Sequence, residues 1–150
     1  MPAVLRFAIY VVIGYGLLVL VVFMLQRRML YFPDSQRPTE AEVRRLGIET
    51  WPGGGQPHKG YIGSTPRSFE KGTVVAFHGN AGSAWQRYYF VHALEPLGYR
   101  VILAEYPGYG GRGGKKTEAS LVADARRTIA RVRERYGDPV YLLGESMGCG

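Results

Sequence analysis

The sequence predicts an α/β domain with a mostly parallel sheet, preceded by an apolar helix. Three short apolar runs of strand length, at 73–77, 100–106 and 140–143, alternate with two segments whose apolar residues recur at helical spacing. Alternating strands and helices form a parallel sheet, because each helix carries the chain back to begin the next strand in the same direction. Nineteen residues without a charge, Phe7 to Leu25, come before all of these segments.

The uncharged stretch is long enough to cross a lipid bilayer. At about 1.5 Å per residue it forms a helix of roughly 28 Å, close to the thickness of a hydrocarbon core. A cleaved signal peptide is the alternative, but its apolar region is normally shorter, and no cleavage site of small residues follows before Gln26. We therefore expect a single-pass transmembrane anchor over residues 5–26. The arginines after the stretch outnumber the basic groups before it, which places the soluble part on the cytoplasmic side.

After the anchor, we expect a linker over residues 27–39 and a soluble domain over residues 40–150. The segment 39–46 has the composition of one or two helical turns, ended by Gly47. A Pro-Gly-Gly-Gly turn follows, and turns of this kind separate short strands. The two strands are expected at 48–51 and 59–62.

The central strand and the two helices have clear boundaries in the sequence. The run 73–77 is almost entirely apolar, which is typical of a strand covered on both faces. Ser83 and Gln86 have the spacing of a capping box, so a helix is expected to begin there. Pro96 and Gly98 end it. A second helix is expected over 117–136, with an apolar face made of Val122, Ala125, Ile129, Val132 and Tyr136.

The composition argues against a metal, a disulfide or a nucleic acid. The chain has three histidines without metal-ligand spacing and a single cysteine. The net charge of +7 would suit an anionic partner, but many of the arginines lie beside the apolar stretch or on the solvated side of the second helix. We therefore expect no metal, no organic cofactor and no nucleic-acid partner.

The last predicted strand breaks into Gly144-Glu145-Ser146-Met147-Gly148, which is a G-x-S-x-G pattern. A serine on a sharp strand-to-helix turn sits in strained backbone, and small residues two positions before and after it let the chain pass closely enough to form the turn. The hydroxyl of Ser146 is then exposed. The N–H of Met147 lies at the start of the next helix, where it can donate to an oxyanion on a bound substrate. The pattern predicts a nucleophile elbow, and a plain glycine-rich turn is the alternative.

Four motifs follow one another along the chain: Gln26 to Pro33 after the anchor, His78-Gly79-Asn80-Ala81-Gly82 after the strand 73–77, Tyr106 to Gly110, and Gly144 to Gly148. In this order they resemble the membrane-anchored serine hydrolases of the α/β-hydrolase superfamily. The resemblance implies an α/β-hydrolase sheet with Ser146 as the nucleophile. It assigns the oxyanion donors to the N–H of Met147 and to one N–H in the loop after the strand, that of Asn80 or of Ala81.

In that family the catalytic acid and histidine follow the serine in the chain, whereas this sequence stops four residues after Ser146. The chain is therefore expected to be a fragment, the N-terminal part of a hydrolase. It is expected to be inactive by itself, since a serine without a base is a poor nucleophile. His78 is expected to organise the oxyanion loop, and a role as the base is the alternative. Glu145 is expected to point away from the serine as a surface or packing residue.

Two other classes of function remain as alternatives. Gly108, Gly110 and Gly113 form a G-x-G-x-x-G pattern, but no helix opens directly at these glycines and the next strand does not end in an acidic residue, so the signal for dinucleotide binding is weak. A phosphate-binding P-loop fails as well, because Tyr109 stands where its first glycine is required. The other alternative is a catalytically dead, membrane-bound interaction protein.

The function expected for the complete protein is the transfer of an acyl group to water. Ser146 attacks an ester, thioester or amide carbonyl, an acyl-enzyme forms, and backbone N–H groups hold the oxyanion. Because the anchor keeps the site near lipid, the expected substrate is a lipid-derived ester or thioester of an apolar acyl group. The lipid bilayer is the expected partner.

The anchor predicts how the protein fractionates. Alkaline carbonate removes proteins that are held on a membrane by charge, but a spanning helix remains in the hydrocarbon core. We expect the full-length protein to stay with the membrane pellet, and a variant lacking residues 5–26 to move to the supernatant. Release of the intact protein by carbonate would contradict the anchor.

Overall fold

The computed structural model describes residues 2–65, 68–69 and 71–150, and it divides the chain into two compact units, Met1–Tyr31 and Phe32–Gly150. The first unit is a single helix, α1 (Ala3–Leu30). Its segment Ala3–Gln26 is long and apolar enough to cross a membrane, a test that a signal sequence also passes. This is weak support for the predicted anchor.

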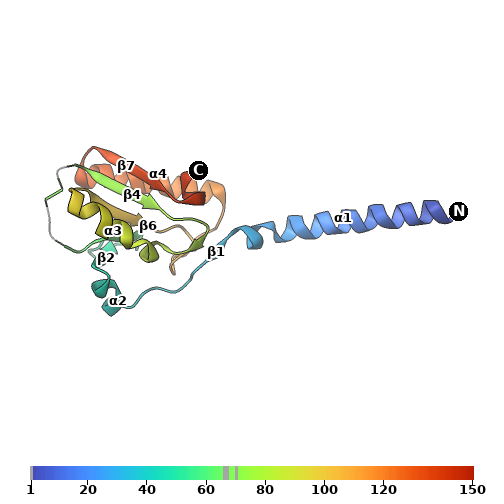
Figure 1. The fold of residues 1–150 in the computed structure, drawn as a ribbon, viewed down its shortest axis with the longest axis horizontal. Coiled ribbons are helices and arrows are strands. Elements are labelled where there is room, and N and C mark those ends of the chain that lie inside the picture. Colours follow the sequence, from blue (N-terminus) through green and yellow to red (C-terminus); the bar gives the residue numbers. More distant parts are fainter. Residues whose placement is uncertain (1, 66–67, 70) are drawn as a thin grey trace. The chain divides into compact units, whose positions relative to one another are not determined.

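The second unit is built on a five-stranded mixed sheet (Figure 1). In space the strands follow the order β2, β3, β6, β4, β7. The middle one of the three parallel strands is β4, called the central strand below, and it pairs with both β6 and β7. In contrast, β3 pairs antiparallel with β2 and with β6. The predicted α/β fold with a parallel core is confirmed. The strands span β2 (Ile48–Trp51), β3 (Gly60–Gly63), β4 (Thr73–Phe77), β6 (Arg100–Ala104) and β7 (Val140–Gly144).

The core lies around β4 and β6. All five residues of β4 and four of the five in β6 are buried, as expected for strands covered on both faces. The strand predicted over 100–106 ends earlier, at Ala104, and Glu105 continues as buried backbone outside the ladder. At the end of the sheet, Tyr141 and Leu142 of β7 are exposed.

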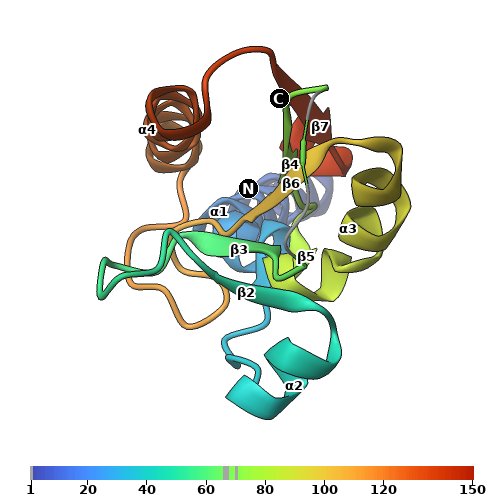
Figure 2. The same ribbon diagram turned by 90° about the vertical axis from the view of Figure 1, so that its left-hand side faces the viewer.

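Two helical layers flank this sheet. Figure 2 shows α3 (Tyr89–Leu94) and α4 (Glu118–Tyr136) on opposite faces of the sheet. The helix predicted to begin after Ser83 is broken into three pieces, with α3 between two short 3₁₀ helices, and Gly98 ends it with a φ of 93°. The remaining short helices are α2 (Glu40–Arg45), η1 (Ala84–Arg87), η2 (Glu95–Leu97) and η3 (Ser146–Cys149).

The buried face of α4 agrees with the predicted one at Val132 and differs from it at Val122. Val122, expected to face the core, is exposed, and the side chain of Asp124 is buried instead. The reason is electrostatic: Asp124 receives hydrogen bonds from Lys59 and Arg112, and burial of a carboxylate is tolerated when it is paired in this way. The residues that α4 buries are Leu121, Asp124, Thr128 and Val132.

Candidate active site

Ser146 occupies the turn that follows β7. It is exposed, and among the residues that the structure describes it is the one non-glycine residue with a positive φ, 53°. Residues other than glycine rarely adopt this backbone conformation, and strained backbone of this kind is found most often at functional sites. The turn is anchored to the central strand, because the Glu145 N–H donates to the Phe77 carbonyl at 3.0 Å. The serine is thus held at the carboxyl end of parallel strands, where ligands bind in sheets of this kind.

The two glycines of the G-x-S-x-G pattern sit where no side chain fits. A Cβ on Gly144 would lie 2.5 Å from the Gly148 carbonyl oxygen, so the turn closes tightly on itself. A Cβ on Gly148 would lie 2.8 Å from the carbonyl carbon of Phe77, at the end of β4. Glycine at both positions therefore lets the turn pack against its own backbone and against the central strand.

The loop after β4 passes beside the serine. A Cβ on Gly79 would lie 3.4 Å from the Cβ of Ser146. Asn80 follows, half-buried, and the next two residues form the short strand β5 (Ala81–Gly82). On the other side of the serine, Met147 is the second residue of η3, and the first N–H groups of a helix have no partner within it. The residues predicted to supply the oxyanion donors therefore belong to two segments that flank Ser146.

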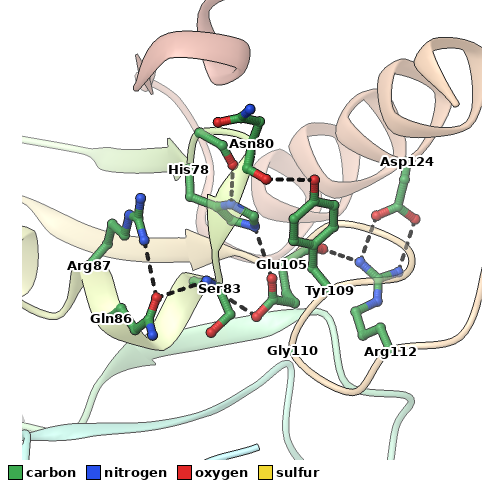
Figure 3. Close-up of polar contacts among 12 residues, drawn as sticks. His78, Asn80, Ser83, Gln86, Arg87, Glu105, Tyr109, Gly110, Arg112 and Asp124 are labelled. Atoms are coloured by element: carbon green, nitrogen blue, oxygen red, sulfur yellow. Dashed lines mark hydrogen bonds and ion pairs between the residues drawn. The ribbon is translucent and has the colours of Figure 1, made fainter. Parts of the chain in front are cut away.

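The ring of His78 is bound to Gly79 and Glu105 (Figure 3). Its side chain is buried, with Nδ1 2.7 Å from the Gly79 carbonyl oxygen and Nε2 2.9 Å from Oε1 of Glu105. A carbonyl oxygen only accepts, so Nδ1 donates, and Nε2 is engaged by the carboxyl group. Neither ring nitrogen is left to take a proton from Ser146. These contacts fit the loop-organising role predicted for His78 and oppose the alternative role as a base.

Glu105 was not recognised in the sequence, and it ties three segments together. While Oε1 contacts His78, Oε2 accepts from the Ala84 N–H at 3.0 Å, at the start of η1. The backbone folds closely over it, because a Cβ on Gly110 would lie 2.5 Å from the Glu105 carboxyl carbon. The aromatic rings of Tyr106 and Tyr109 pack edge-on around His78, with centroids 4.8 and 5.1 Å away. The loop His78–Gly82, which is predicted to supply an oxyanion donor and is called the oxyanion loop below, therefore packs on a buried polar pair surrounded by aromatic rings.

Glu145, the neighbour of the serine, is held by another pair. Arg87 binds it through two hydrogen bonds, Nη2 to Oε1 at 2.7 Å and Nε to Oε2 at 3.2 Å, and the Tyr89 hydroxyl donates at 3.3 Å. The hydrogen bonds and charge of Arg87 keep the pKa of Glu145 below its ordinary value. The carboxylate is thus directed toward η1 and α3, as the sequence predicts for a residue outside the catalytic machinery.

The chain that enters the second unit adds a strand to the oxyanion loop. The short strand β1 (Phe32–Pro33) pairs in parallel with β5. The Phe32 N–H donates to the Asn80 carbonyl at 3.0 Å, and the Asp34 N–H donates to the Gly82 carbonyl at 3.1 Å. The Asn80 carbonyl also accepts from the Tyr109 hydroxyl at 3.0 Å. The segment predicted as a linker is therefore hydrogen-bonded into the loop over its second half, although the boundaries at residues 27 and 39 stay a prediction.

Comparison with known families decides the class of this site. A family model described as serine aminopeptidase, S33, matches residues 69–150, which is more than half of the chain. The matched region contains the oxyanion loop, Glu105 and the serine turn. The chain belongs to this family of α/β-hydrolases. The predicted superfamily is confirmed, and the family is one of hydrolases.

The relatives of this hydrolase are longer proteins. An uncharacterized protein of Mycobacterium tuberculosis is 36% identical over 136 residues, which cover 82% of this chain and 46% of the relative. The lysophosphatidylserine lipase ABHD12 of Xenopus tropicalis and that of Gallus gallus are each 35% identical over 80 residues, which cover 51% of this chain and 21% of the lipase. The hydrolase chain thus spans about half the length of the mycobacterial relative and about a fifth of the lipases.

Among the described residues of the hydrolase, no three His, Cys, Asp or Glu side chains lie close enough to hold a metal ion. The residues that the sequence did not reveal are Glu105, Arg87 and the β1 strand. The one signal for Glu105 was a lone carboxylate at the end of an apolar run, and such a residue is buried only when it is paired.

Replacing Gly148 tests the packing of the serine turn. In Gly148→Ala the new methyl group meets the backbone of β4, and overpacking of this kind costs about 1–3 kcal/mol. Gly113→Ala is the matched control, because no atom lies within 4 Å of its Cβ position. Thermal unfolding of the full-length hydrolase is expected to show a lowered midpoint for Gly148→Ala and an unchanged one for the control. Equal midpoints for the two variants would contradict the close contact.

Replacing Phe32 tests whether β1 positions the oxyanion loop. Phe32→Pro removes the N–H that donates to Asn80, whereas Phe32→Ala keeps this N–H and loses only an exposed side chain. Losing one oxyanion donor costs about 100-fold or more in kcat, so a displaced loop is expected to cost at least about tenfold. Steady-state hydrolysis of a chromogenic ester by the full-length enzyme should show this loss in kcat, with KM little changed. An equal loss in Phe32→Ala would assign the effect to the side chain.

Proposed function

We propose that Ser146 is the nucleophile of a serine hydrolase that cleaves an ester, thioester or amide through an acyl-enzyme. The observation that carries this proposal is the exposed Ser146 in a strained turn, with the Gly79 loop packed beside it. Strain that exposes a hydroxyl has no structural benefit, and it suits a nucleophile that must approach a carbonyl carbon. A catalytically dead interaction protein would have no need of this conformation.

The proposed reaction follows from the groups around the serine. The Ser146 hydroxyl attacks the carbonyl carbon, and the negative charge that develops on the carbonyl oxygen is held by the N–H of Met147 and by that of Asn80 or Ala81. His78 is bonded through both nitrogens, and His92 Nε2 lies 2.9 Å from the Leu46 carbonyl oxygen. His58, the third histidine, lines clefts that do not contain Ser146. We therefore propose that the general base is a histidine outside residues 1–150, oriented by an acid that also follows the serine, as in the order of α/β-hydrolase triads. This chain by itself is then inactive.

The proposed substrate is a lipid-derived ester or thioester with an apolar acyl chain. Two observations support it: the apolar helix α1 at the start of the chain, and relatives whose name is lysophosphatidylserine lipase. We propose a single-pass anchor over residues 5–26, a linker over 27–39 and a hydrolase domain from residue 40, with this domain on the cytoplasmic side. Amides are the second candidate, because the matching family is described as an aminopeptidase.

Labelling with a fluorophosphonate tests the nucleophile. These probes phosphonylate an activated serine, so the full-length protein should become labelled, and Ser146→Ala should lose the label entirely. Ser35→Ala, at an exposed position outside the turn, is the matched control and should label like the parent. Labelling that persists in Ser146→Ala would assign the nucleophile to another residue, and an unlabelled parent protein would favour the dead interaction protein.

A further inference from the structure

A basic cleft lies outside the serine turn. Its volume is about 430 Å³, which is within the range of small-ligand sites. A neighbouring cavity of about 340 Å³ shares two of its residues, Arg37 and His58, but also contains the carboxylates of Glu40 and Glu49. Among the described residues that line the larger cleft, none carries a carboxylate. It is lined by Arg37, Pro57, His58, Lys59, Arg112 and Gly113.

The positive charges of this cleft outnumber the negative ones. Lys59 and Arg112 share one carboxylate, Asp124, at 3.0 Å for Lys59 Nζ and at 2.8 and 3.2 Å for the two terminal nitrogens of Arg112 (Figure 3 shows the Arg112 pair). Burial opposes ionisation of Asp124, but these hydrogen bonds and charges outweigh it and hold its pKa at about 2. Asp124 is therefore fully ionised near pH 7, yet it is a single charge against two. Arg37 adds a third cation.

Arg37 is held in place without a carboxylate of its own. Its Nε donates to the Gly110 carbonyl at 3.3 Å, and its Nη2 donates to the Gly111 carbonyl at 3.1 Å. A Cβ on Gly111 would lie 2.8 Å from Cγ of Arg37, so the arginine packs closely on the glycine loop. The contacts described for Arg37 leave Nη1 available, and a guanidinium fixed in this way loses little entropy when it binds an anion.

His58 contributes a ring nitrogen that nothing in the described part of the chain satisfies. Its Nε2 is buried and has no hydrogen-bond partner among the described residues. Burial, together with the charges of Arg37 and Arg112, lowers the pKa of His58 to about 4. Buried polar atoms without partners are uncommon, and each calls for a ligand, a water or a strained neighbour. An anion in the cleft would accept from Nε2 and would at the same time offset the charges that keep the ring neutral.

We propose that this cleft binds a phosphate group between Arg37 and Arg112, with His58 Nε2 donating a hydrogen bond to it. The phosphate belongs either to a free phosphate compound or to the headgroup of a lipid. A dinucleotide is excluded, because the glycine loop at Gly108–Gly113 does not open a helix: α4 begins only at Glu118. The cleft contains neither Ser146 nor the oxyanion loop. The proposed phosphate site therefore does not depend on whether Ser146 is the nucleophile.

The test follows the titration of His58 by NMR in the full-length protein, purified in a zwitterionic detergent with labelled histidine. In sodium chloride of matched ionic strength the pKa of His58 should stay at about 4. Inorganic phosphate should raise it toward the ordinary value of about 6.5, because the bound anion favours the imidazolium. This measurement needs no variant and no activity. An identical titration in phosphate and in chloride would overturn the proposal.

Two charge-matched variants test whether Arg37 binds the phosphate. Arg37→Gln should weaken phosphate binding by about tenfold or more, measured by calorimetry. Arg126→Gln removes the same charge from an exposed position of α4 and should bind within about twofold of the parent. Equal weakening in both variants would reduce the effect to net charge and overturn the site. Glycerol 3-phosphate and a short-chain phosphatidic acid, compared below the micelle concentration, distinguish a free phosphate compound from a lipid headgroup. The compound that binds more tightly identifies the class of ligand. If neither compound binds, the proposal is overturned.

Discussion

The pair between His78 and Glu105 supports most of what surrounds the serine. Both side chains are buried, and the pair joins the loop after β4 to the chain after β6, while the second oxygen of Glu105 holds the start of η1. Removing one partner from such a buried hydrogen-bonded pair costs about 1–3 kcal/mol, because the remaining polar group cannot reach water. Besides stabilising the fold, the pair fixes the direction in which the oxyanion loop leaves the sheet. It thereby also fixes the position of Gly79 beside Ser146.

Asp124 is a second buried carboxylate that joins distant segments, as Glu105 does at the oxyanion loop. It binds Lys59, after the Pro-Gly-Gly-Gly turn, and Arg112, within the glycine loop, to α4. Arg112 also donates to the Glu105 carbonyl, so the two buried carboxylates belong to one continuous network. Polar networks in an interior rigidify a fold only when every member is satisfied. Among the described residues, two buried side-chain atoms beside the network have no hydrogen-bond partner: Ser83 Oγ, next to the Ala84 N–H that Glu105 accepts from, and His58 Nε2, at the basic cleft.

The sequence predicted the parts of the fold that depend on local pattern. An apolar run predicted β4 and a neighbouring glycine-rich turn predicted β2, both with their observed boundaries. Thr39 and Thr117 cap the helices expected at these positions. What could not be predicted depends on distant partners. The burial of Asp124 in place of Val122 on α4 could not be predicted, because it depends on Lys59 and Arg112, which lie outside the helix. Glu105 had no visible partner in the sequence, and no periodicity marks a two-residue strand such as β1.

The β1 strand leaves almost no free chain between α1 and the oxyanion loop. The helix ends at Leu30, and Phe32 is already hydrogen-bonded, so Tyr31 alone separates them. A protease that cut between Phe32 and the start of α2 would both free the globular unit and strip a strand from its loop. Separation of the two units and loss of the β1 pairing would then be a single event. In the same way, a chimera that exchanges the N-terminal helix keeps an intact loop only if its junction lies before Phe32.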